Sequence, residues 1–273
     1  MGFFASSGIL NRRGFFGGTT AAPFSPSDIS GLQLWLDATT GLFDATSGGS
    51  AVTTDGSAVA RWEDQSGNGN HATQGTSNNR PILKTSIQNS KNVVRFDGSN
   101  DRLTCGDVLD LGTNDISIFI VCKITNASAG LVGKSRAAGN EKRYSLLREN
   151  SKLYFLSELQ SGATNLNTYP EKTSDTSSAF RLLTASYKRL DGRYLRINKS
   201  ATANVSSGND TGSWNTAWEF LIGAYQNSTG DSSTIFYPLN GDICEIIVYI
   251  GTALTGTQRD NVETYLYDKW GIT

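Results

Sequence analysis

Hydrophobic and polar residues alternate in short runs along most of the chain, which is the pattern of half-buried β-strands. The early runs lie at residues 32–37, 59–62 and 93–96, and the last of these leads into Asp97-Gly98, a dipeptide typical of turns. The longest run, residues 116–124, places isoleucines and one cysteine on one face and a mixed set on the other. This region predicts consecutive β-strands.

Strand-like runs continue to the end of the chain. They cover residues 144–147 and 152–156, 180–187 and 193–197, 218–225, and 243–250. Glu149-Asn150-Ser151 connects the first pair and Asp191-Gly192 the second, so both pairs are predicted hairpins. No helical pattern interrupts the strands, which excludes the βαβ units of a parallel sheet.

One helix is predicted, at the C-terminal end. Thr255 and Gln258 have the spacing of a capping box, and Gly271 is placed to end the helix. The apolar residues between them form a single stripe: Val262, Tyr265, Leu266 and Trp270. Many strands followed by one helix predict an all-β domain built as a two-sheet antiparallel sandwich.

Residues 1–28 differ from the rest and are predicted to be an extended N-terminal arm before a domain at 29–273. The segment has no helical or strand period, and Pro23 and Pro26 separate it from the first strand. Its apolar residues are Phe3, Phe4, Ile9, Leu10, Phe15 and Phe16. We expect a partner surface to take them up, with packing back onto the sandwich as the alternative.

Charge and cysteine content narrow the choice of partners. A net charge of −1 over 273 residues gives no attraction for nucleic acid or for an anionic membrane, and no apolar run is long enough to span one. We expect no signal peptide, because no basic residue precedes the N-terminal apolar stretch. Cys122 and Cys244 are in register with neighbouring isoleucines and, with Cys105, are too few for a disulfide framework; we expect buried free thiols compatible with a reducing cytosol.

Five segments in order carry a family resemblance. They are the opening strand at 32–38, a tryptophan strand and turn at 59–72, an FDG strand at 94–98, a G-x-I-x-E strand at 239–249 and the helix at 253–271. Together they resemble the concanavalin-A-like lectin and glucanase superfamily, and within it the laminin-G-like jelly rolls of bacterial surface and phage proteins. The resemblance covers the chain from about residue 30 and implies a jelly roll with Trp35, Trp62 and Trp270 at core positions. It fixes no ligand, because this sandwich hosts lectins, adhesins, glycanases and architectural domains.

Catalysis is not expected. Glycan hydrolysis needs two carboxylates facing each other across a cleft, and the Glu-x-Asp-x-x-Glu motif of the glucanases that this chain resembles is absent. Glu63 and Asp64 are adjacent and Asp242 and Glu245 are three apart, so each pair is expected on opposite faces of a strand. The single histidine, His71, has no nucleophile motif to serve.

One segment has the spacing of a calcium loop. Asp64, Ser66 and Asn68 alternate as oxygen ligands do, but the closing glutamate is absent. We favour a turn in which Asp64 and Ser66 accept backbone N–H bonds, with calcium as the alternative and no other cofactor predicted.

Sugar recognition needs exposed aromatic faces beside amides or carboxylates. Trp214, Asn215, Tyr225 and Asn227 supply both around one predicted loop, and Tyr169 lies in a second candidate loop. Trp218 is expected in the core with Phe220 and Ile222, whereas Trp214 is equally compatible with packing and with binding.

The leading hypothesis is a non-enzymatic structural or accessory protein of a phage virion, of the capsid-decoration, head or tail-fibre type. Its arm would dock on other virion proteins, and its domain, made in the host cytoplasm, would be displayed on the virion surface and adhere to host glycans. The alternative is a secreted or cell-surface, extracellular bacterial carbohydrate-binding module, and a degenerate glycanase ranks third. Location on capsid or tail, ligand and oligomeric state are left open, a homo-oligomer included.

Overall fold

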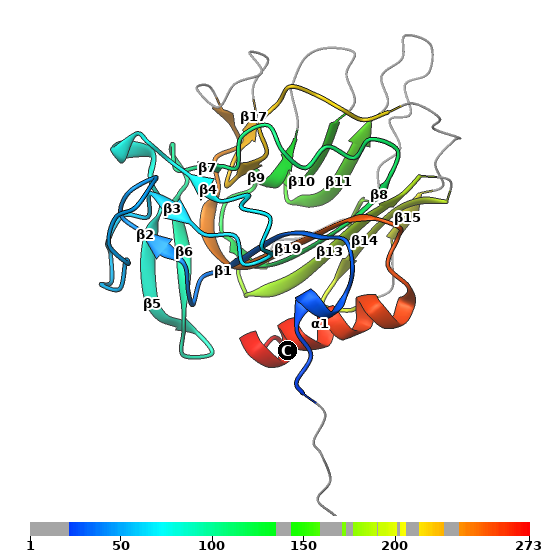
Figure 1. Ribbon diagram of the computed structural model, residues 1–273, viewed down its shortest axis with the longest axis horizontal. Coiled ribbons are helices and arrows are strands. Elements are labelled where there is room, and N and C mark those ends of the chain that lie inside the picture. The colour runs from blue at the N-terminus through cyan, green and yellow to red at the C-terminus, as the bar shows by residue number, and fades with distance from the viewer. Residues whose placement is uncertain are drawn as a thin grey trace, which may run out of the picture.

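The computed structural model describes residues 22–134, 143–158, 171–172, 177–189, 191–200, 203–205, 213–226 and 235–273. Two large antiparallel sheets lie face to face, and the helix α1 (Gly256–Trp270) runs along the outer side of one of them (Figure 1). The two-sheet antiparallel sandwich with one C-terminal helix is therefore confirmed.

In the described part of the chain, eight strands form sheet A and nine form sheet B. Sheet A contains, from edge to edge, β15 (Ala203–Val205), β14 (Gly192–Ile197), β13 (Arg181–Lys188), β8 (Asp115–Ile124), β19 (Asn240–Gly251), β6 (Lys91–Asp97) and β5 (Ile82–Gln88), with β1 (Leu32–Asp37) paired to β19. Sheet B contains β12 (Glu171–Lys172), β11 (Lys152–Glu158), β10 (Arg143–Glu149), β9 (Ala129–Lys134), β16 (Leu221–Ile222), β7 (Leu103–Thr104), β4 (Ala72–Thr73), β3 (Arg61–Trp62) and β2 (Leu42–Phe43). The remaining elements are a small ribbon of β17 (Tyr225–Gln226) and β18 (Ile235–Phe236), and the 3-10 turns η1 (Pro26–Asp28) and η2 (Ser77–Asn79).

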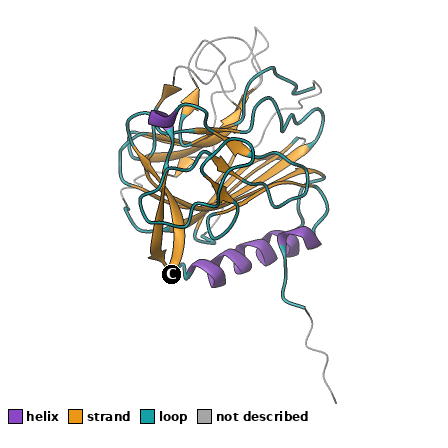
Figure 2. Cartoon of the chain, turned by 60° about the vertical axis from the view of Figure 1, so that its left-hand side comes forward, coloured by secondary structure: helices purple, strands orange, loops and turns teal. Residues whose placement is uncertain are grey.

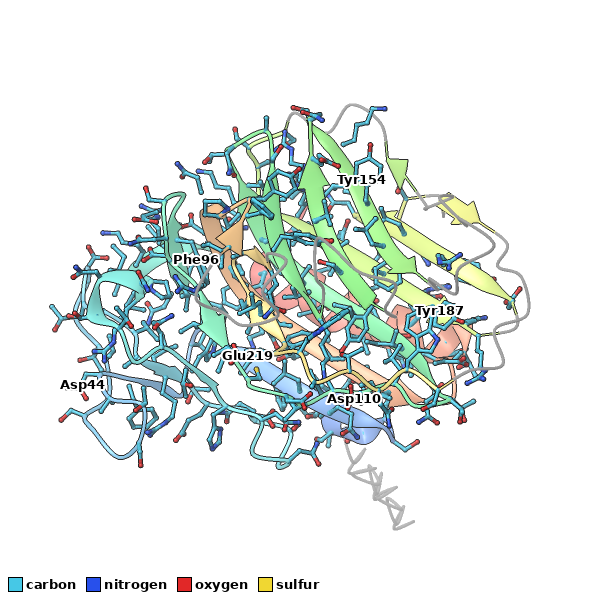
Figure 3. The ribbon with its side chains drawn as sticks, turned by 90° about the horizontal axis from the view of Figure 1, so that it is seen from above. Asp44, Phe96, Asp110, Tyr154, Tyr187 and Glu219 are labelled. Carbon is cyan, nitrogen blue, oxygen red and sulfur yellow. The ribbon has the colours of Figure 1, made fainter. Side chains whose placement is uncertain are left out.

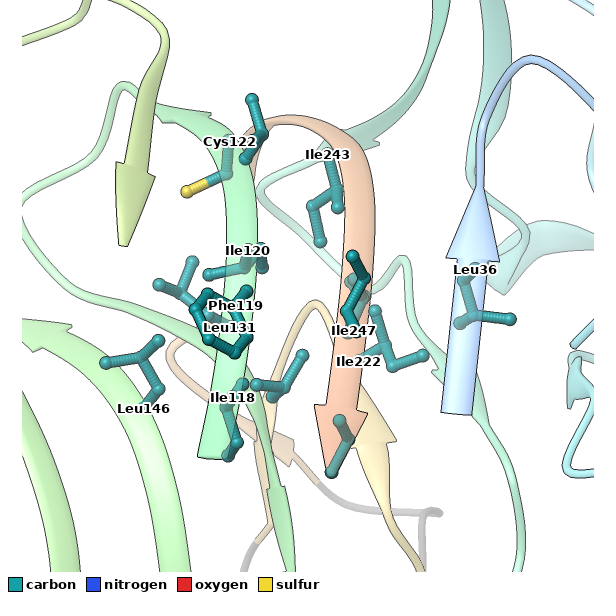
Figure 4. Packing of buried hydrophobic residues seen from close by; sticks show 14 of the residues in the cluster. Leu36, Ile118, Phe119, Ile120, Cys122, Leu131, Leu146, Ile222, Ile243 and Ile247 are labelled. Atoms are coloured by element: carbon teal, nitrogen blue, oxygen red, sulfur yellow. The ribbon is translucent and has the colours of Figure 1, made fainter. Parts of the chain in front are cut away.

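The main core lies between the two sheets. Alternate residues of β8 point into it, and Ile118, Ile120 and Cys122 are fully buried there. Leu131 of β9 and Leu146 of β10 meet them from sheet B (Figure 4). Burial of apolar side chains on this scale is the main stabilising term of a sandwich.

Part of the other face of sheet A is also buried, because α1 covers it along β8 and β13 (Figure 2). Phe119 and Ile247 are register partners on that face and are fully buried. Leu266 and Trp270 of α1 are fully buried as well, so the helix makes a third layer of the domain. The predicted helix, with its Thr255–Gln258 capping box and its left-handed Gly271, is confirmed.

Two predicted strands are interrupted. The run at 59–62 pairs only over Arg61–Trp62, and the run at 218–225 is divided into β16 and β17 by a bend at Gly223. Gly223 has φ +83°, and a Cβ there would lie 2.3 Å from the Phe96 ring. Close approach of the ring therefore requires glycine at the bend and ends the pairing. Trp218, predicted in register with Phe220, is buried at 5% exposure but belongs to no strand.

Residues 1–21 of the predicted arm lie outside the described residues. The remainder of the arm packs on the domain: Pro26 is buried, and its carbonyl accepts a 2.8 Å hydrogen bond from the Tyr249 hydroxyl. The ring of Phe24 meets that of Tyr265 edge-on at 6.1 Å. Phe24 and Pro26, which were predicted as part of the arm, therefore pack on the domain.

The cysteines are free, and Cys122 and Cys244 are buried as predicted. Burial raises the pKa of the Cys244 thiol well above its ordinary value, so the sulfur stays protonated and behaves as a small apolar group. No helix in the described part of the chain is both long and apolar enough to span a membrane.

Candidate functional site

One opening on the described part of the surface lies at one end of sheet A. It is an open cavity of about 440 Å³, lined by residues from three parts of the chain that are far apart in the sequence: 113–115, 188–189 with 191, and 251–252. Its walls carry the amide of Asn114, the hydroxyl of Thr113 and the charged groups of Lys188 and Asp191. In Figure 3, Tyr187, the residue before Lys188, marks this end of the molecule, and Asp44 marks the other.

Strand pairing brings the three segments together. β8 begins at Asp115, where the antiparallel neighbours β13 and β19 end. The Asp115 carboxylate then joins all three: Oδ1 accepts the backbone N–H of Arg189 at 2.8 Å, and Oδ2 accepts that of Ala253 at 3.0 Å. The loops that line the cavity are thus held by a carboxylate whose two oxygens are both used.

The predicted sugar-binding loop adjoins this cavity. Trp214 bridges to Gly112, and its backbone N–H donates to the Gly112 carbonyl at 2.7 Å, which places Asn215 beside the 112–114 segment. The Trp214 indole is only 4% exposed, because it stacks on Tyr187 with centroids 4.9 Å apart and planes 26° apart. Asn215 is exposed. The Asn215 amide is therefore open to a ligand, whereas the Trp214 indole packs inside the domain.

Lys134 anchors the loop that contains Trp214 and Asn215. Its side chain is 2% exposed, and its ammonium lies 2.7 Å from Asp107 Oδ1 and 2.8 Å from Asp110 Oδ1. The ammonium also donates to the Thr216 carbonyl at 3.2 Å. A buried lysine paired with two carboxylates fixes the 107–110 and 214–218 segments against β9.

The other predicted aromatic residues are not at this cavity. Asn227 and Tyr169 lie outside the described residues. Tyr225 is 7% exposed and packs against Tyr237 with centroids 6.2 Å apart, so its face is covered. Phe236, 43% exposed on the same ribbon, is the aromatic residue open to solvent there, and sequence reasoning missed it because no alternation marks so short a strand.

The segment with calcium-loop spacing is a hydrogen-bonded turn. Asp64 Oδ1 accepts the backbone N–H of Trp35 and of Ser66, both at 2.9 Å. Its Oδ2 accepts the Ser66 hydroxyl at 2.7 Å and the Asn70 N–H at 3.0 Å, and the Ser66 hydroxyl accepts the Asn68 N–H at 3.3 Å. This is the arrangement that the turn interpretation requires, with four donors of the chain bonded to the carboxylate. Among the described residues, no three His, Cys, Asp or Glu side chains are grouped to hold a metal.

Asp242 and Glu245 do not lie on opposite faces of β19, contrary to expectation. The register shifts at Cys244, which is an extra residue in the strand. Their β8 partners, Lys123 and Val121, are two residues apart, so both carboxylates face the outer side. A simple count of three residues gave the wrong phase because it could not anticipate the bulge.

Both carboxylates are nevertheless committed to structural partners. Asp242 accepts bonds of 2.6 and 3.0 Å from Arg95. Glu245 is fully buried under α1 and pairs with the Lys269 ammonium at 2.8 Å. Its other donors are Trp35 Nε1 at 2.7 Å, Tyr265 Oη at 2.9 Å and Trp270 Nε1 at 2.6 Å. Burial raises the pKa of Glu245, and the Lys269 ammonium acts in the opposite direction.

No family model matches the sequence, and no curated protein matches it. Solved structures match the fold. The binding domain of Paraclostridial Mosquitocidal Protein 1 aligns with a TM-score of 0.58 at 12% identity, covering 91% of this chain and 56% of that one. The receptor binding domain of botulinum neurotoxin D gives 0.53 at 11% identity, over 88% of this chain and 54% of that one. The receptor binding domain of botulinum neurotoxin type G aligns with a TM-score of 0.51 at 13% identity, covering 86% of this chain and 51% of that one.

This chain thus spans little more than half the length of those structures. At this level of identity the likeness establishes a shared β-sandwich fold and leaves the function and the ligand open.

Proposed function

We propose that the domain is a non-catalytic, lectin-like binding module that holds a glycan in the cavity at the end of β8, β13 and β19. The cavity itself carries the proposal. Its volume of about 440 Å³ lies within the range of small-molecule sites, and its lining offers amide, hydroxyl, carboxylate and cationic groups for sugar hydroxyls. The three solved structures named above, each titled as a binding domain, support a binding role for this fold.

The absence of catalysis in this proposal rests on how the carboxylates are used. Hydrolysis needs one carboxylic acid that donates a proton and one carboxylate that acts as base or nucleophile. In the cavity, both oxygens of Asp115 accept backbone N–H bonds, and Asp191 lies 3.5 Å from the Lys188 ammonium. We expect no turnover of β-glucans.

The test is a glycan array with the full chain, followed by calorimetry on each ligand found. Asn114→Ala removes an exposed amide from the cavity and should weaken binding about tenfold, the effect of one lost hydrogen bond. Asn92→Ala is the matched control, because Asn92 lines a different cavity beside β2. Failure to bind any glycan, or equal binding by both variants, would contradict the proposal.

The setting that we propose for this module is the surface of a phage particle, with capsid decoration or a tail fibre as the form. The support is the sequence of the arm, whose six apolar residues at 3–16 have no period of their own and fit a docking segment. A secreted or cell-surface bacterial carbohydrate-binding module is the competing setting. Finding the chain in purified virions, or its absence from them, decides between the two.

A further inference from the structure

A second, smaller cavity adjoins the first. It has a volume of about 80 Å³ and lies between the outer face of sheet A and the first turn of α1, where Gly256 and Arg259 line it. Lys188 lines both cavities, so the two are neighbours at that residue.

The floor of the smaller cavity is set by strand register. Ser117, Ser186 and Tyr194 are aligned as partners across β8, β13 and β14, so their three hydroxyls form one row. In the next row Thr184 and Arg196 are partners. Such a surface offers several hydrogen-bond donors within a few ångströms.

Charge in the lining is of one sign. Lys188, Arg196 and Arg259 line the cavity, and no carboxylate does. The acids that pair with these cations lie outside the lining: Asp191 is 3.5 Å from Lys188 and Asp260 is 3.0 Å from Arg259. The amino end of a helix of fifteen residues adds partial positive charge on the same side.

Arg196 supplies an independent observation. Its side chain is 14% exposed, its Nη2 lies 3.4 Å from Glu263 and its Nη1 lies 3.8 Å from Asp260. Its Nε is buried and has no hydrogen-bond partner among the described residues. Although the guanidinium also donates to the Lys199 carbonyl at 3.0 Å, its Nε–H is left free to donate to a bound acceptor.

Size decides what that acceptor is. About 80 Å³ is room for about two or three water molecules at roughly 30 Å³ each, which is enough for an oxyanion and too little for a sugar ring. We propose, building on the binding role above, that the ligand is an acidic glycan: its carboxylate, sulfate or phosphate group enters the smaller cavity while its ring occupies the larger one. Lys188, Arg196 and Arg259 are the residues that recognise the anion.

The first test addresses the anion alone. The probe is inorganic sulfate, titrated into the full chain at constant ionic strength and followed by the NMR signal of Arg196 Nε–H, assigned by its loss in Arg196→Lys. We expect sulfate to shift this signal in a saturable way. The Kd for sulfate should be at least tenfold higher in Arg259→Gln. It should be unchanged in the control Lys84→Gln, which alters a cation on β5 at the distant edge of sheet A. If sulfate shifts the Nε–H signal no more than chloride does, the anion site is overturned.

The second test uses sialylated, sulfated and phosphorylated oligosaccharides, each beside its neutral parent. We expect one acidic class to bind at least tenfold more tightly than its parent, with the advantage lost in Arg259→Gln and reduced by salt. Equal binding of acidic and neutral forms overturns this inference and leaves the proposed function intact. If sulfate binds and no oligosaccharide does, the glycan ligand is overturned both in the proposed function and in this inference.

Discussion

One carboxylate joins the first strand, the last strand and the terminal helix. Glu245 of β19 accepts hydrogen bonds from Trp35 of β1 and from Trp270 of α1, and pairs with Lys269. All of its partners are donors, so the buried network is satisfied and fixes the helix in one position. A glutamate in this position serves architecture, which explains why its neighbour Asp242 on the same face forms no acid–base pair with it.

The G-x-I-x-E pattern gains a physical reason at each named position. A Cβ at Gly241 would lie 2.0 Å from the Lys123 carbonyl oxygen, so only glycine permits the strands to pair there. Ile243 fills the core between the sheets, and Glu245 lies beyond the bulge on the helix side. The unnamed position before the glutamate is Cys244, the bulged residue that changes the phase.

Asp101 should make stability depend on pH. It is 6% exposed, and burial, followed by repulsion from Asp97, raises its pKa to about 7. Because the folded pKa exceeds the unfolded value of about 3.9, this contribution to stability is complete below about pH 4 and is lost as the pH rises through about 7. Asp101→Asn keeps the acceptor for the Asp97 N–H and never carries the charge.

We therefore expect Asp101→Asn to match the wild type in thermal unfolding at pH 4 and to melt at a higher temperature at pH 8. The pH 4 comparison is the internal control for any packing effect of the exchange. A variant that is no more stable than the wild type at pH 8 would show that the pKa of Asp101 is not raised by burial.

Calcium should not stabilise the turn at Asp64. All four hydrogen bonds to this carboxylate come from donors of the chain itself, so a cation would have to displace them. Tight binding of an ion would raise the unfolding free energy by RT ln(1 + [L]/Kd). We expect equal melting temperatures in millimolar calcium and in excess chelator, with Asp64→Ala lowering both equally. A rise with calcium that Asp64→Ala abolishes would instead identify a site.

At the scale of elements, α1 is the outer layer of the domain rather than a terminal appendage. Val262, Leu266 and Trp270 are fully buried against sheet A. Trp270→Ala should therefore lower the unfolding free energy by about 3–5 kcal/mol, the usual effect of truncating a buried tryptophan. Asp268→Ala, at an exposed position of the same turn, should change it by less than about 0.5 kcal/mol. Chemical denaturation measures both, and a small effect of Trp270→Ala would mean that the helix is not part of the core.

Sequence periodicity predicted those elements whose alternation is unbroken. Residues 116–124 and both hairpins fall where expected, because each has one face against the core. The mixed face opposite the isoleucines did not by itself predict a covering layer, and the structure buries Phe119 and Val121 of that face completely. Strands of two residues and the bulge at Cys244 were not predictable, because they depend on contacts such as that of Gly223 with Phe96 rather than on a local pattern.

At the scale of the whole molecule, the candidate site depends on topology. Its walls come from segments that only the pairing of β8 with β13 and β19 brings together, so no motif in the sequence could mark it. Asn215, predicted because an amide beside aromatic residues is a local signal, lies beside the 112–114 segment and does not line the cavity, whereas Lys188 and Arg196 had no local signal that set them apart from other strand cations. The burial of Trp214 on Tyr187 is likewise a tertiary contact.

The domain and its N-terminal arm should separate cleanly at residue 22. We expect the protein without residues 1–21 to fold as a β-sandwich that melts like the full chain, and to lose the docking that we propose for the arm. Deleting residues 1–28 also removes Pro26, whose carbonyl accepts the Tyr249 hydroxyl, and Phe24, which packs on Tyr265. It leaves a buried hydroxyl without its acceptor, a loss of about 1–3 kcal/mol. The longer deletion should therefore melt several degrees lower, measured by circular dichroism on both proteins.

Equal melting temperatures of the two proteins would mean that the 24–28 segment contributes nothing to the stability of the domain. Loss of folding in the shorter deletion would mean that the arm belongs to the sandwich and does not dock elsewhere.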